Sequence, residues 1–148
     1  MDFSYRGPKP ERYLIISSLL ISGGLRLDSL RQNTSGYSRG LCGQNLHVHH
    51  VDQCNKVIAF HRWDQGGPGD DVVILLNFST QTFGDYTIGF PRSGSWRVRF
   101  NSDSNLYDPS FGNAASYDTL SNGSPYDGMP YSGNIGFGPY SAVIFSQD

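Results

Sequence analysis

The sequence predicts an antiparallel β-sandwich of about seven or eight strands, preceded by a short segment of undetermined structure. The first observation is a set of three apolar runs between Lys56 and Asn101, which read KVIAFHRW, DDVVILLNF and SWRVRFNSD. Each run is too short for a typical helix and is rich in the β-branched and aromatic residues that pack well on a pleated sheet. The second observation is the pair of turn sequences between the runs, QGGPGD and FPRSGS, which bound strands.

The middle run is apolar at every position from Val72 to Leu76. A strand with one solvent-exposed face alternates between apolar and polar residues, and this run does not alternate. The strand is therefore expected to be covered on both faces. Leu75 should therefore be buried, and its truncation should destabilise the fold.

The third run alternates between apolar and basic residues. Trp96, Val98 and Phe100 should share one inward face, with Arg97 and Arg99 pointing outward, because alternate residues of a strand lie on the same face. The aromatic residues of this run are therefore interpreted as core.

Length and charge restrict the classes of function. The 148 residues correspond to about one domain, and 11 basic residues against 13 acidic ones give a net charge of −2 without a basic stripe. Nucleic acid is therefore not expected as a partner. No apolar stretch approaches the roughly 20 residues that span a bilayer, so a membrane partner is not expected either.

The N-terminal region carries one apolar run, residues 13–21, preceded by Lys9 and Arg12. It has two interpretations: a weak signal peptide, or a packed helix or strand. Asp2 and Glu11 lie where a signal peptide should be positive, which favours the packed segment and a cytoplasmic rather than a secreted location.

Cysteine and histidine residues gather between positions 42 and 54. Cys42 and Cys54 bracket His47, His49 and His50, and His47 and His49 should share one face of a strand. This spacing fits none of the paired patterns of structural zinc sites, so no metal and no other cofactor is expected. Two free thiols are the default, although a disulfide would form in an oxidising compartment.

The order of short motifs in the second part of the chain resembles a known family. The motifs are VIAFHRW, GDDVV, NF, YTIGFP, GSWRVRFNSD, FGN and GPYSAVIF, at residues 57–63, 69–73, 77–78, 86–91, 94–103, 111–113 and 138–145. Together they resemble the C-terminal all-β domain of α-amylases and 1,4-α-glucan branching enzymes, in glycoside hydrolase family 13. The resemblance covers residues 40–148.

The resemblance implies Greek-key connections and a non-catalytic module that packs against the catalytic barrel of an α-glucan-acting enzyme. Residues 1–39 would then be a leader that could include a remnant of the last barrel helix, and the chain would be a truncated or split enzyme. The alternative from another class is a stand-alone α-glucan-binding module. A secreted metal-binding protein is a third reading, which depends only on the histidines and the leader.

No catalytic residue is expected. A glycosidase needs two carboxyl groups held on rigid elements, roughly 5–5.5 Å apart in retaining enzymes. Most aspartates here lie in turns beside Gly, Pro or Ser, where Asp bonds to nearby backbone, and the only glutamate is Glu11. The strand-end motifs of the family's barrel are absent from the sequence.

Sugar binding would use aromatic rings as stacking platforms, with polar groups beside them. Trp63 ends an apolar run beside a Gly-rich loop, and tyrosines crowd the later loops. The candidate carbohydrate-binding residues are Trp63, Tyr107, Tyr126 and Tyr131.

Overall fold

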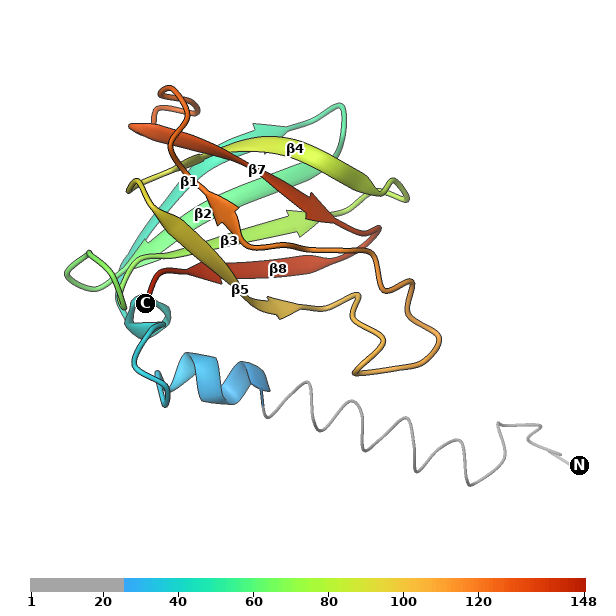
Figure 1. Cartoon of the computed structure of the whole chain (residues 1–148), viewed down its shortest axis with the longest axis horizontal. Helices are drawn as coiled ribbons and strands as arrows, with labels where there is room; N and C mark the ends of the chain where they lie inside the picture. Colours follow the sequence, from blue (N-terminus) through green and yellow to red (C-terminus); the bar gives the residue numbers. More distant parts are fainter. Residues whose placement is uncertain (1–25) are drawn as a thin grey trace, which may run out of the picture.

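The computed structural model describes residues 26–148 (Figure 1). Residues 26–31 are helical, and the 3-10 helix η1 (Arg39–Leu41) follows them. The strands are β1 (Asn45–Asp52), β2 (Val57–Trp63), β3 (Val72–Asn77), β4 (Phe83–Phe90), β5 (Ser95–Asn101), β6 (Thr119–Leu120), β7 (Tyr131–Phe137) and β8 (Ala142–Ser146). Both interpretations of residues 13–21 lie outside the described residues. Within residues 26–148, no helix has the length and apolar character needed to cross a membrane.

The strands form two packed sheets. One has six strands in the order β1-β2-β3-β8-β5-β6, and the other pairs β4 with β7. Neighbouring strands are antiparallel throughout, and β8 lies between β3 and β5 because the chain crosses between the sheets. Figure 1 shows β4 and β7 lying across the larger sheet. The predicted antiparallel β-sandwich of about seven or eight strands is confirmed.

The main core fills the space between the two sheets. Its fully buried members come from both layers: Val57, Ala59, Val73, Leu75, Ile88, Phe90, Trp96, Ile135, Phe137, Val143 and Phe145. A second apolar cluster lies on the opposite face of the larger sheet and includes Val72 and Ile74. Alternate residues of β3 thus enter different clusters, which confirms that this strand is covered on both faces.

The expectation for β5 is partly wrong because of a β-bulge. Val98 pairs with Phe145 and Phe100 pairs with Ile144, so Arg99 is an extra residue that has no partner across the strand pair. An extra residue reverses the alternation beyond it. Trp96 and Val98 therefore face the main core as predicted, whereas Phe100 joins the second cluster on the other face.

The bulge also changes the environment of Arg99, which was predicted to point outward into solvent. Its side chain is 9% exposed, and its guanidinium carbon lies 3.7 Å from the centre of the Tyr37 ring. Arg99 Nε donates a hydrogen bond to Ser146 Oγ at 2.9 Å. Arg97 is exposed as predicted and pairs with Asp148.

Candidate functional site

The outer face of the six-stranded sheet, which points away from β4 and β7, carries a band of apolar side chains. Residues directly opposite each other on neighbouring strands point to the same face of a sheet. Two paired rows cross β1, β2 and β3 on this face, Val48–Phe60–Ile74 and Val51–Ile58–Leu76. Ile74 and Leu76 both contact the second apolar cluster, which places the two rows on the outer face.

The N-terminal segment covers part of this band. Leu30 and Leu41 belong to the second apolar cluster, and Tyr37 packs against it. Arg26 Nε also donates to the carbonyl oxygen of Arg99 at 3.1 Å. Residues 26–41 therefore lie on the outer face of the sheet, over β3, β5 and β8.

Strand β1, at the edge of the same sheet, is left exposed. Leu46, Val48 and Val51 are 58, 48 and 61% exposed, and they lie beside Ile58 and Phe60, which are only half-buried. Single exposed apolar residues are ordinary on protein surfaces, but a contiguous group of them marks an interaction site. We call these five residues the outer-face patch.

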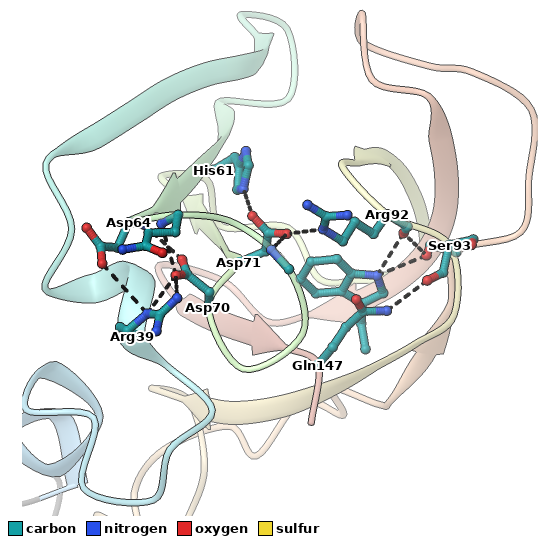
Figure 2. Close-up of polar contacts among 12 residues, drawn as sticks. Arg39, His61, Asp64, Asp70, Asp71, Arg92, Ser93 and Gln147 are labelled. Atoms are coloured by element: carbon teal, nitrogen blue, oxygen red, sulfur yellow. Dashed lines mark hydrogen bonds and ion pairs between the residues drawn. The ribbon is translucent and has the colours of Figure 1, made fainter.

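Two adjacent aspartates just before β3 fix the loops at one end of the sandwich (Figure 2). Asp70 accepts hydrogen bonds from the backbone N–H groups of Asp64 and Gln65, at 2.8 and 3.0 Å. It also pairs with Arg39, with 2.7 Å between Nη2 and Oδ2. Asp70 therefore ties the β2–β3 loop to the N-terminal segment.

Asp71 forms the second half of this cluster. Its side chain is 3% exposed and binds His61 Nε2 at 2.7 Å and Arg92 Nε at 2.5 Å. The N–H of Gly67 donates at 2.8 Å to Asp71 Oδ2, the oxygen that also binds Arg92. The ring of Trp63 stacks on His61 with 4.4 Å between ring centres. As Figure 2 shows, Asp71 connects β2 and β3 to the turn that follows β4.

These contacts decide the charge state of both carboxyl groups. Burial raises the pKa of Asp70 and Asp71, but hydrogen bonds to the charged form outweigh burial and hold the pKa below its usual range. Hydrogen bonds to the charged form also lower the pKa of Asp52, Asp108 and Asp148. A glycosidase acid needs the opposite shift. These carboxylates are therefore suited to holding structure and not to donating protons.

A second polar network joins the edge strand β1 to the smaller sheet. His50 Nδ1 contacts the Asp127 carboxylate at 2.9 Å, and His50 Nε2 contacts the Tyr86 hydroxyl at 2.7 Å. That hydroxyl donates to Asp52 at 2.8 Å, and burial, with the Asp52 charge, raises the pKa of Tyr86 well above its usual value. This network closes one side of the sandwich.

Histidines and cysteines near β1 do not gather into a larger cluster. The rings of His47 and His49 lie 6.2 Å apart, and burial lowers the pKa of His49. Cys42 and Cys54 are free and exposed. The part of the chain that the structure describes contains no group of three or more His, Cys, Asp or Glu side chains that could hold a metal ion.

The four candidate sugar-binding residues occupy different places. Tyr107 stacks on Phe100, at the second cluster, with 5.3 Å between ring centres. Tyr126 is exposed in the turn before β7, where it forms a bridge with Met129. Tyr131 begins β7 and lines a groove, and Trp63 ends β2 with one ring face against His61.

Of these four, Trp63 and Tyr131 are linked through intervening residues. Trp63 stacks on His61, which binds Asp71, which binds Arg92, and Arg92 lines the same groove as Tyr131. Sequence reasoning missed this network. Its only local signal is a pair of acidic residues directly after a Gly-rich turn, GGPGDD.

The structure is thus a two-layered β-sandwich with an apolar patch on one sheet and polar networks that fix its loops. The part of the chain from His47 onward identifies its family. Residues 47–148 match the family described as alpha amylase, C-terminal all-beta domain. The chain belongs to this family, which confirms the predicted resemblance.

Several curated proteins similar to this chain are 1,4-alpha-glucan branching enzymes. The GlgB protein of Mycobacterium tuberculosis is 33% identical over 93 residues, which are 62% of this chain and 12% of that enzyme. GlgB 2 of Xanthomonas oryzae pv. oryzae is 41% identical over 56 residues, 38% of this chain and 8% of the enzyme. GlgB of Aromatoleum aromaticum is 39% identical over 70 residues, 47% of this chain and 11% of the enzyme. The match thus covers 12% or less of each of these relatives.

Proposed function

We propose that this chain is the non-catalytic C-terminal domain of an enzyme that acts on α-1,4-glucans, of the branching-enzyme class. The membership of the all-β family supports the domain type, and the three branching enzymes named above support the class. The catalytic partner is the barrel of such an enzyme, and this domain shields apolar surface on it.

The outer-face patch is the observation that carries this proposal. The family that this chain matches is a C-terminal domain. In a complete enzyme with such a domain, the catalytic region therefore comes earlier in the chain and is joined to the N-terminal side of the domain. Residues 26–41 lie on the outer face of the larger sheet, next to the uncovered β1 side. A barrel reached through this segment would meet the outer-face patch first, and would bury Leu46, Val48 and Val51.

Sedimentation velocity on the full chain tests the docking role. Without a barrel, the outer-face patch has no partner, so the chain should self-associate as its concentration rises. Val48→Asp places a charge in the centre of the patch and should keep the chain monomeric. The matched control is Leu120→Asp, at a similarly exposed apolar position (55% against 48% for Val48) on β6, the opposite edge of the same sheet.

The control should associate like the parent. If the parent is monomeric at all concentrations, or if both variants behave alike, the patch is not a docking surface. The stand-alone module would then be the better reading of the chain.

A further inference from the structure

A polar groove of about 410 Å³ opens at the end of the sandwich where three loops meet. Its walls come from the β2–β3 loop, the β4–β5 turn, the start of β7 and the C-terminal residues. The lining residues are Pro68, Pro91, Arg92, Pro130, Tyr131 and Gln147, together with Ser93. It is separate from the outer-face patch, because none of the patch residues lines it.

The guanidinium group of Arg92 is held in place by Asp71. Its Nε donates to the buried carboxylate of Asp71, which also binds His61 (Figure 2). Nη1 and Nη2 remain as donors on a side chain that is 48% exposed. Since Asp71 already compensates the charge of Arg92, the groove favours a neutral ligand with acceptor atoms over an anion.

Gln147 supplies the complementary group. Its Nε2 donates to the Ser93 carbonyl at 2.9 Å, which fixes the plane of the amide (Figure 2). Its Oε1 stays available as an acceptor in the groove that Arg92 and Ser93 also line. A ligand that both donates and accepts hydrogen bonds fits this set.

Tyr131 adds an exposed ring at the start of β7. An aromatic face beside fixed donors and acceptors suits a polyhydroxylated ring, which has apolar C–H groups on one face and hydroxyl groups at its edge. The groove is within the size range of small-ligand sites.

We infer that this groove binds a short segment of a neutral sugar chain, with Tyr131 as the stacking platform and Arg92 and Gln147 as hydrogen-bonding partners. The choice of an α-1,4-linked glucan rests on the proposed function. Trp63 acts indirectly in this scheme, because its ring packs on His61. His61 in turn helps to hold Asp71, which holds Arg92. Trp63 is a positioning residue in this scheme.

The test is a titration of the full chain with maltoheptaose, followed by the amide signals in two-dimensional NMR. We expect saturable shifts around Tyr131, with a Kd from roughly millimolar to high micromolar, because one ring contributes little affinity. Tyr131→Ala should weaken binding about tenfold, and Tyr131→Phe should bind like the parent because it keeps the ring. The matched control is Tyr140→Ala, a more exposed tyrosine in the turn between β7 and β8, which should leave binding unchanged.

Two results would overturn the inference: Tyr131→Ala binding as tightly as the parent, or shifts confined to residues outside the groove. Equal binding of cellohexaose, whose linkage is β-1,4, would overturn the choice of an α-1,4-linked glucan. The docking role is tested separately by Val48→Asp, which lies outside the groove. Failure of the titration alone would therefore remove the sugar groove and leave the docking role standing.

Discussion

Replacing Leu75 by alanine removes three carbon atoms from a side chain that is 0% exposed between the two sheets. At about 0.8 kcal/mol for each buried group, transfer alone costs about 2.4 kcal/mol. β3 is hydrogen-bonded to β2 on one side and to β8 on the other, so its backbone has little room to move into the space. A cavity term of about 24 cal/mol per Å³ is then added. We expect the free energy of unfolding to fall by about 3–5 kcal/mol in total.

Urea unfolding followed by tryptophan fluorescence measures this loss, since Trp96 lies in the same core. With a slope of roughly 1–3 kcal/mol per molar urea, the midpoint should fall by about 1 M or more. The matched control is Leu106→Ala, which truncates a leucine that is 76% exposed and should change stability by no more than about 0.5 kcal/mol. An unchanged midpoint for Leu75→Ala would refute the central position of β3 in the sandwich.

Two further predictions concern chemistry. Purified chain incubated with soluble starch should release no reducing ends and leave the colour of the iodine complex unchanged; turnover that persists after rigorous removal of host amylase would contradict the non-catalytic assignment. Burial raises the pKa of Asp71, but hydrogen bonds from His61, Gly67 and Arg92 outweigh burial, so its folded-state pKa lies below its unfolded value. The stabilising contribution of Asp71 is therefore present above about pH 4 and is lost as the pH falls through its folded-state pKa. Because Asp71→Asn lacks this carboxyl group, its free energy of unfolding should decline less steeply in acid than that of the parent. At pH 7 the variant should be about 1–3 kcal/mol less stable, and parallel acid profiles would show that Asp71 has no such role.

The strands could be predicted because their signals are local. The run from Val72 to Leu76 is continuous in apolar residues, and burial of alternate residues in two different clusters follows from its period of two. The bulge at Arg99 could not be predicted in this way. Nothing in SWRVRFNSD shows that one residue is skipped in pairing with β8, yet this skip moves Phe100 to the other face.

The candidate site was less accessible to sequence reasoning because its parts come from distant segments. Asp71 and Arg92 are 21 residues apart in the chain and meet only when the β4–β5 turn folds back over β3. The aromatic residues could be named from composition, but not their surroundings: Tyr107 packs on Phe100, whereas Tyr131 lies beside the fixed Arg92. Local pattern gives the candidates, and tertiary contacts decide which of them share a site.

The proposed role of the outer-face patch is to dock this domain on a catalytic barrel. It is tested by the branching activity and solubility of a chimera in which residues 26–148, which contain all five residues of the outer-face patch, replace the segment of the Mycobacterium tuberculosis enzyme that is similar to this chain. We predict a soluble, active chimera, and loss of both properties when Val48→Asp is introduced into it, with Leu120→Asp as the harmless control. A Val48→Asp chimera as soluble and active as the unmodified one would contradict this role.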